Sequence, residues 1–274
     1  MLEKLTFEIQ ESPVLYSVDG EVLTSKTHKV LSRSNDNVEI STMKNSYKPM
    51  LNSDFMETTE RMKKISGFEM TGYSELDGGK IILSHLKNNL SDFNINGHKI
   101  EDYLLMGSSF DGRYSFFVGT TTVLLRCTNQ FSRITQAEKV RHTKSAPKRI
   151  EELLTALEIY FDSRKVMYEK FQKMTKVKID PIIRQMAVDY IMEVSNEDRL
   201  EGKISTRKAN IIDIINSNID FEMGDLGQNM WALLNGVTRY TTHERKQKEQ
   251  SFGNVFGSGA QINTRMYQFA NQFV

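Results

Sequence analysis

Hydrophobic and polar residues alternate in short runs over the first half of the chain, which is the spacing of strands that bury one face. Turn residues separate the runs, and two of these turns, Asp19-Gly20 and Asp77-Gly78-Gly79, predict hairpins. We therefore expect strands at residues 5–9, 14–18, 22–30, 38–42, 68–76, 80–86, 100–106 and 114–128.

The hydrophobic period changes to that of a helix after Ser145. Apolar residues recur along one helical stripe from position 150 to 174, and Pro147 occupies the first turn, where its missing N–H costs little. A shorter stripe at 53–65, with Ser53 as a candidate N-cap and Gly67 at its end, interrupts the strands. Later helices are expected at 182–194, 206–216, 226–248 and 261–273.

Strands that precede helices in this order predict an α+β fold. The expected architecture is an N-terminal, mainly antiparallel β-meander followed by a long helix and a C-terminal helical region, with the helices packed on one face of the sheet. Within one continuous globular domain we distinguish a mainly β region with one short helix at 1–145, a helical region at 146–250, and a flexible tail with a short helix at 251–274.

Composition narrows the class of protein. The chain has 274 residues, of which 39% are hydrophobic and 26% charged, as is typical of a soluble protein with its own core. The single cysteine excludes an internal disulfide and fits a reducing compartment. No apolar run reaches the roughly 20 residues of a membrane span, and the N-terminus lacks the features of a signal peptide. We therefore expect a cytoplasmic protein with no membrane contact.

Positive charge is concentrated in one segment, although the whole chain has a formal net charge of only +1. Between Arg126 and Arg149 there are seven Lys or Arg residues and one acid, Glu138. Lys148 and Arg149 fall at the start of the expected long helix, where a cation opposes the helix dipole. A bound polyanion would offset this placement, because Lys and Arg contacts with phosphate dominate nucleic-acid affinity. A solvated loop is the alternative interpretation.

Aromatic residues precede the basic segment on neighbouring expected strands. Tyr114 and Phe116 share one face of a strand by alternation, so they are candidates for stacking on unpaired bases, with sheet core as the alternative. The candidate nucleic-acid-binding residues are Arg113, Tyr114, Phe116, Arg126, Arg133, Lys139, Arg141, His142, Lys144, Lys148 and Arg149.

Catalytic and metal-binding signatures are absent from the sequence. No histidine is paired with another histidine or with the cysteine at ligand spacing, and the glycines do not form a phosphate-binding Walker motif. Asp102 and Asp111 lie around expected hairpins, where carboxylates commonly bond to turn backbone, so a metal-dependent nuclease is the weakest alternative. We expect no enzymatic activity, no catalytic residues, no metal and no cofactor.

Five segments, in the expected order over roughly residues 40 to 270, together resemble a family carried by bacteriophages, plasmids and mobile elements, domain-of-unknown-function family 932. The chain departs from the family pattern at Thr242, where an acid often precedes the last histidine, so it offers no carboxylate there. The segments are Gly78-Gly79-Lys-Ile-Ile-Leu-Ser-His-Leu86, Tyr103-Leu-Leu-Met106 with Phe110-Asp-Gly112, Thr122-Val-Leu-Leu-Arg-Cys-Thr-Asn-Gln130, Arg141-His-Thr143, and Trp231-Ala-Leu-Leu-Asn-Gly-Val-Thr-Arg-Tyr-Thr-Thr-His243.

The resemblance carries no established catalytic residues. The family resembles the RecT- and Redβ-like single-strand annealing proteins in its occurrence in phage and plasmid genomes and in its order of a sheet followed by helices. Those proteins bind single-stranded DNA along a positive groove and assemble into rings or filaments. The resemblance therefore implies a protein that binds single-stranded DNA and promotes annealing or recombination for a phage or plasmid. It would act as a homo-oligomer in the cytoplasm of a bacterial host.

The alternative is a phage protein-interaction factor without nucleic-acid binding, such as a host-takeover, counter-defence or virion component. The apolar residues near the C-terminus are the candidates for contact with a partner or with a neighbouring subunit. They are Phe252, Phe256, Phe269 and Phe273.

Overall fold

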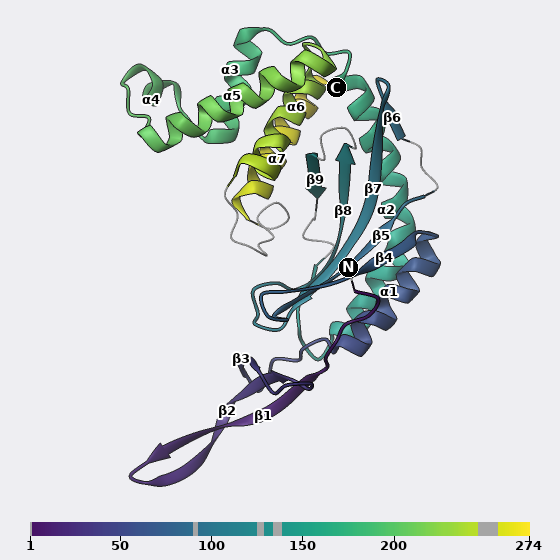
Figure 1. Ribbon diagram of the computed structural model, residues 1–274, viewed down its shortest axis with the longest axis vertical. Helices are drawn as coiled ribbons and strands as arrows, with labels where there is room; N and C mark the ends of the chain where they lie inside the picture. Colours follow the sequence, from purple (N-terminus) through teal and green to yellow (C-terminus); the bar gives the residue numbers. More distant parts are fainter. Residues whose placement is uncertain (1, 90–92, 125–128, 134–138, 246–256) are drawn as a thin grey trace. The chain divides into compact units, whose positions relative to one another are not determined.

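The structure, a computed structural model, describes residues 2–89, 93–124, 129–133, 139–245 and 257–274 (Figure 1). The side chains of residues 120–124, 129–133 and 157–165 lie outside this description. Contacts within the chain divide it into two compact units. Unit 1 comprises Met1–Leu90, Tyr103–Thr120 and Ile134–Phe161, and unit 2 comprises Ser91–Asp102, Thr121–Arg133 and Asp162–Val274.

Unit 1 contains two sheets and one complete helix, α1 (Asn52–Ser66). Its strands, two of which also contribute residues to unit 2, are β1 (Ile9–Val18), β2 (Glu21–Arg33), β3 (Glu39–Lys44), β4 (Glu69–Leu76), β5 (Ile81–Lys87), β7 (His98–Ser109), β8 (Phe116–Leu124) and β10 (Lys139–Val140). The smaller sheet has the order β1-β2-β3 and the larger the order β10-β8-β7-β5-β4. Every strand pair whose register is described is antiparallel.

The hairpin between β4 and β5 forms where the turn residues predict it. Asp77, Gly78 and Gly79 all have positive φ values, of 52°, 66° and 87°. At Gly79 a Cβ atom would lie only 2.7 Å from the ring of Phe7, so both the backbone conformation and the close approach require glycine there. The turn therefore sets the register of β4 against β5. Because Gly79 has no side chain, the turn also leaves space for Phe7, in the chain that precedes β1.

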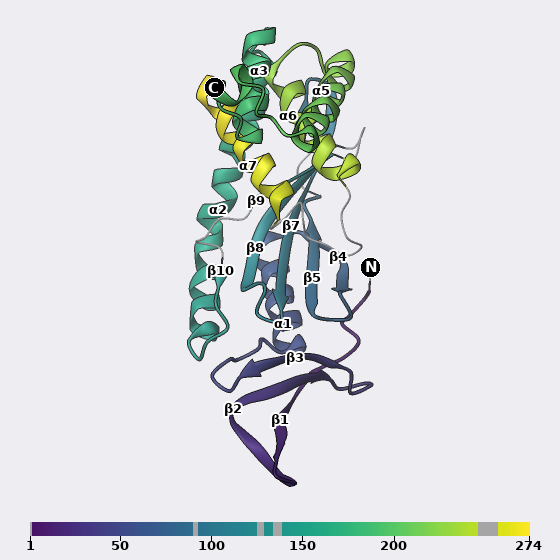
Figure 2. The same cartoon turned by 90° about the vertical axis from the view of Figure 1, so that its left-hand side faces the viewer.

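Helix α1 covers one face of the larger sheet (Figures 1 and 2). Phe55 and Met62 are fully buried beneath it, and the ring of Phe55 lies 6.3 Å from that of Phe116 on β8. Thr59 Oγ1 donates to Ser84 Oγ on β5 at 3.1 Å, which ties the middle of the helix to the sheet. Apolar contact and one buried hydrogen bond thus hold α1 in place.

The ends of α1 are satisfied by backbone geometry and by a distant side chain. Gly67 ends the helix as predicted, with φ 68° and its N–H donating to Lys63 O. Ser53 is not the N-cap, which was the prediction. The N-cap is Leu51, and the carboxylate of Glu8 accepts from the N–H groups of Asn52 and Ser53 at 2.7 and 2.9 Å. Sequence periodicity cannot find a cap that comes from 44 residues away.

Unit 2 is mainly helical. Its elements are β6 (Phe93–Ile95), β9 (Asn129–Arg133), α3 (Pro181–Met192), α4 (Asn196–Leu200), α5 (Thr206–Leu226), α6 (Met230–Arg239), the π-helical turn η2 (Tyr240–Glu244), α7 (Ser258–Ala270) and η3 (Asn271–Phe273), together with the C-terminal part of α2 (Ala146–Met174). Side chains of Asp180, Ser205 and Asn229 accept backbone N–H groups at the starts of α3, α5 and α6.

The core of unit 2 is built around Trp231 on α6 and Phe171 on α2, whose rings lie 4.9 Å apart. Met266 and Phe269 of α7 are buried in the same core. Residues 251–274 were expected to form a flexible tail with a short helix. The helix is present, and in the described part of this segment, 257–274, it is packed into the core.

The α+β fold class is confirmed, with the antiparallel strands followed by long helices. The long helix begins at Ala146, one residue before Pro147. Helix α5 was predicted to stop near residue 216. It continues through Asn216 and Asn218 to Leu226. Helix α6 begins only at Met230, after the Asn229 cap.

Close packing of α5 against α6 gives a test of unit 2. A Cβ atom at Gly236 would lie 2.5 Å from the Cα of Ile219, whereas one at Gly224 would meet nothing within 4 Å. We expect Gly236→Ala to lower the free energy of unfolding by about 1–3 kcal/mol through overpacking. Gly224→Ala should raise it by about 0.5–1 kcal/mol through helix propensity. Urea unfolding of both variants measures the difference, and equal stability of the two would contradict this account of the packing.

Candidate functional site

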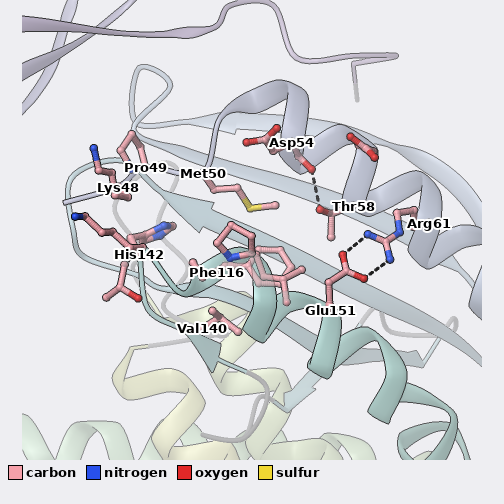
Figure 3. A pocket seen from close by; sticks show the side chains of 16 residues that line it. Lys48, Pro49, Met50, Asp54, Thr58, Arg61, Phe116, Val140, His142 and Glu151 are labelled. Atoms are coloured by element: carbon pink, nitrogen blue, oxygen red, sulfur yellow. Dashed lines mark hydrogen bonds and ion pairs between the residues drawn. The ribbon is translucent and has the colours of Figure 1, made fainter. Parts of the chain in front are cut away.

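Unit 1 contains a cavity of about 500 Å³ between α1 and the beginning of α2. Its floor is apolar and consists of buried side chains from the chain before α1, from β8, from β10 and from α2: Met50, Phe116, Val140 and Ile150. Figure 3 shows Met50 and Phe116 in the middle of the cavity, with polar side chains toward both ends. A cavity of this volume and lining is of the size that binds small ligands or parts of larger ones.

One end of the cavity is cationic. Lys48 and Lys144 line it, both are exposed, and neither forms an ion pair with a residue that the structure describes. Thr143, Ala146 and Pro147 line the same region, where α2 begins. The first turn of α2 has no acidic residue, so the partial positive charge of the helix terminus adds to that of the lysines.

The other end of the cavity carries acids. Asp54 and Glu57 of α1 lie on its wall, and Arg61 of α1 forms a two-pronged ion pair with Glu151 of α2 (Figure 3). Burial and the neighbouring carboxylates of Glu8 and Glu57 raise the pKa of Asp54. The hydrogen bond from Arg61 lowers the pKa of Glu151. An anion is therefore favoured at the Lys48 and Lys144 end and repelled from the Asp54 and Glu57 end.

His142 was predicted to contact nucleic acid, but its ring is 9% exposed and packed inside unit 1. Its Nε2 lies 3.2 Å from Ser108 Oγ, and its ring centroid lies 5.3 Å from that of Tyr47. The Tyr47 hydroxyl donates to the backbone oxygen of Ser109 at 2.8 Å. Burial lowers the pKa of His142 and raises that of Tyr47. A buried, neutral imidazole cannot hold a phosphate, so the role of His142 is to fix the loop before α2.

Three other predicted residues form contacts within the fold itself. Phe116 is 1% exposed and packs on Phe55, so sheet core is its role, and it reaches the cavity only as part of the floor. Arg113 forms ion pairs with Asp77 and Asp111 across two turns. Tyr114 is partly buried, and its backbone N–H and C=O both bond to Ser109 Oγ. The contacts of Phe116 with Phe55 and of Arg113 with Asp77 join segments distant in sequence, so local pattern does not reveal them.

The basic residues around the start of α2 are brought together. Arg141, Lys144 and Arg149 are exposed and make no ion pair with described residues, and Lys148 makes only a long contact of 3.8 Å with Glu152. Lys139 is half-buried in β10 and has interactions of its own. Arg126 lies outside the described residues, as does the side chain of Arg133, whose backbone is in β9.

Lys48 is the functional candidate that the sequence did not indicate. It joins the basic residues of 141–149 only because the loop before α1 crosses the start of α2, with the Lys48 N–H 3.5 Å from the backbone oxygen of His142. The cation itself is one of many on the chain. Neither charge density nor periodicity near Lys48 distinguishes it from the others.

The four phenylalanines suggested for subunit contact divide into three groups. Phe269 is 4% exposed and belongs to the unit 2 core, and its ring packs on those of Tyr190 and Phe273. Phe273 is 37% exposed. Phe252 and Phe256 lie outside the described residues. Of the two phenylalanines in this group whose side chains are described, only Phe273 has exposed surface for a subunit contact.

Acidic side chains do not gather into a metal site within the described part of the chain. Among the described residues, no three His, Cys, Asp or Glu side chains are grouped so that they could hold a metal ion. Asp102, one of the two acids of the nuclease alternative, is fully buried, and Asp111 is paired with Arg113. No helix in the ranges that the structure describes is long and apolar enough to span a membrane.

Comparison with known proteins gives one match. The family model "Domain of unknown function (DUF932)" matches residues 39–265, which is most of the chain and includes every described residue that lines the cavity. No curated protein and no solved structure matches the chain. The family resemblance seen in the sequence is therefore confirmed.

Two histidines, the buried His142 and the half-buried His85, give unit 1 a pH dependence. Burial lowers the pKa of both His85 and His142, so the unfolded chain binds protons more readily than the folded one. Stability should therefore fall as the pH drops through the ordinary histidine pKa of about 6.5, and level off below the folded pKa values. Urea unfolding at several pH values measures this.

The variant His142→Gln separates this contribution from that of other groups. It should lower stability at neutral pH yet flatten the dependence between about pH 7 and 5, because one difference in proton uptake is gone. An unchanged slope in His142→Gln would show that its ring is not buried in the neutral form.

Proposed function

The chain belongs to the family of unknown function DUF932, and we propose that it binds single-stranded DNA and promotes strand annealing for a phage or plasmid, acting as an oligomer without nucleotide hydrolysis. The observation that carries the proposal is the group of exposed cations at the start of α2, which we call the cationic rim: Lys48, Arg141, Lys144, Lys148 and Arg149.

The electrostatics of the cationic rim favour a polyanion. Four of its members have no ion-pair partner among the described residues, and they surround a helix terminus that lacks an acid in its first turn. Cations at this position cost roughly 0.3–1 kcal/mol each against the helix dipole, so an anionic ligand supplies the compensation that the chain does not. A chain of phosphates fits better than a single anion, because the rim extends beyond the cavity over several residues.

The adjoining cavity suits the bases of such a strand. Phosphates held by Lys48 and Lys144 would leave a neighbouring base beside the apolar floor of Met50 and Ile150. Contacts of this kind are tolerant of sequence, because every base has an apolar face. Single strands are preferred over duplex in this arrangement, since paired bases are not available to enter a cavity.

Two further observations support the biological part of the proposal. The meander followed by a long helix has the order that suggested the RecT- and Redβ-like annealing proteins, although this is an analogy of fold. The family resemblance also implies that the protein is encoded by a phage or a plasmid. Annealing needs two strands held close together, so an oligomer follows from the proposed activity.

A salt titration tests DNA binding. Anisotropy of a labelled oligothymidylate should report an affinity that falls steeply with salt, with a slope of about −0.7 per phosphate contact in the logarithmic plot. The variant Arg141→Ala/Lys144→Ala/Lys148→Ala/Arg149→Ala should bind far more weakly. Its slope should be shallower by about 0.7 for each phosphate that the substituted side chains no longer neutralise.

A matched variant controls for net charge. Lys4, Lys26, Lys44 and Lys64 are exposed, lie elsewhere in unit 1 and make no described ion pair, so replacing all four by Ala removes the same charge. This control should keep most of the affinity and the slope. Equal losses of affinity in the two variants would show that the effect depends only on overall charge. Absence of binding by the wild type at low salt would refute the proposal.

The second candidate function is a protein-interaction factor without nucleic-acid binding. Exposed apolar side chains at the tip of the β1–β2 hairpin favour it, because such residues usually mark a protein contact. The salt titration separates the two candidates, since this one predicts no affinity for the oligonucleotide at any salt concentration.

A further inference from the structure

The β1–β2 hairpin continues beyond its sheet as a two-stranded arm, residues 14–26 (Figure 1). Strand β3 pairs only with the His28–Ser32 part of β2, so no third strand among the described residues supports the arm. A hairpin of two strands is marginally stable in water on its own. Yet this arm exposes five large apolar side chains: Leu15 60%, Tyr16 48%, Val18 48%, Val22 70% and Leu23 38%.

The apolar residues occupy both faces of the arm. Tyr16 pairs with Leu23, so these two share a face, whereas Val22 pairs with Ser17 on the opposite one. The arm therefore cannot hide its apolar surface by bending onto its own sheet. The tip carries two acids, Asp19 and Glu21, which disfavour DNA and anionic membranes as the occupant.

Unit 2 carries a second apolar surface that the described residues leave largely open, although the ring of Tyr190 also packs on that of Phe269. Ile182, Met186 and Tyr190 follow one another at every fourth position of α3 and are 70%, 55% and 43% exposed. We call them the α3 stripe. The opposite side of the same helix, with Ala187, Val188 and Ile191, is buried in the core, so the stripe is an additional apolar face.

The two surfaces match in charge and in length. Lys176 and Lys178 are exposed just before α3, make no described ion pair, and adjoin the positive N-terminus of the helix. They complement Asp19 and Glu21 at the tip of the arm. The stripe is about 12 Å long at 1.5 Å per helical residue, and the apolar part of the first arm strand, from Leu15 to Val18, is about 10 Å long.

We propose that the arm of one copy of this chain docks on the α3 stripe of a second copy. The contact is heterologous, because one partner contributes the arm and the other the stripe. In such a pair the first copy keeps a free stripe and the second keeps a free arm, so assembly continues into a ring or a filament. The interface supplies the oligomer that the proposed function needs, but it is independent of DNA binding.

Complementation between two variants tests this interface. Tyr16→Ser/Val22→Ser/Leu23→Ser removes the arm surface, and Ile182→Gln/Met186→Gln removes the stripe. By sedimentation velocity over a concentration series, wild type should form large assemblies and each variant alone should be monomeric. An equimolar mixture should give a one-to-one dimer and nothing larger, because only one arm and one complementary stripe remain.

The control is Leu200→Gln/Ile214→Gln, which removes exposed apolar side chains elsewhere in unit 2 and should leave assembly intact. Circular dichroism and thermal unfolding verify that every variant is folded. Reversing the tip charges with Asp19→Lys/Glu21→Lys should weaken assembly, and Lys176→Glu/Lys178→Glu on the partner should restore it.

Three outcomes would overturn the interface: a monomeric wild type at all concentrations, assembly retained by the stripe variant, or no dimer in the mixture. The oligonucleotide titration on the same variants keeps the two proposals apart. Monomeric variants that still bind with the full salt slope support both proposals, while assembly without DNA binding leaves the interface standing and removes the proposed function.

Discussion

Burial of one face of the larger sheet beneath α1 is the constraint on which the candidate site depends. Phe55 and Phe116 are both fully buried in this layer, and Thr59 bonds to Ser84 within it. The start of α2 lies on the same layer, as the ion pair between Arg61 and Glu151 shows. Two helices that pack on one sheet leave a groove between them where no side chain is long enough to fill it. The cavity is this groove, and its apolar floor is part of the same core that holds α1.

Charge is distributed around that groove in a way that stability alone does not explain. Asp54 and Glu57 lie toward one end of the cavity and Lys48 and Lys144 toward the other. Among the described residues that line it, only Arg61 and Glu151 form an ion pair. Both of these side chains are about half exposed, so their pair contributes little to stability. Selection for stability would place an acid in the first turn of α2, and none is there. A ligand that supplies negative charge accounts for this arrangement.

Sequence alone predicted the α+β order, the β4–β5 turn and the end of α1, because each of these follows from local chemistry. Asp77-Gly78-Gly79 needs positive φ values, and Gly67 needs a left-handed backbone, whatever surrounds them. The cap of α1 and the ion pairs of Arg113 could not be predicted, because Glu8 and Asp77 come from distant segments. Alternation placed Tyr114 and Phe116 on one face but could not say whether that face was core, and for Phe116 it is.

The candidate site was predicted in part for the same reason. The exposed cations of 141–149 were visible as a local excess of charge, whereas Lys48 joins them only through the path of the chain before α1. His142 sat within the charged segment by sequence and is buried by structure, because the loop that carries it folds inward against Tyr47 and Ser108. Charge density thus indicated a segment, and the fold selected the side chains within it.

The arm and the α3 stripe bear on how a single cationic rim could serve annealing. In the proposed function one rim would hold one strand, so bringing two complementary strands together would require more than one rim. A heterologous contact can repeat at every step, so each added copy brings one more rim to the assembly. A symmetric contact between two copies would stop at a pair of rims. The proposed annealing over many bases favours the first arrangement, because a long strand would then meet several rims.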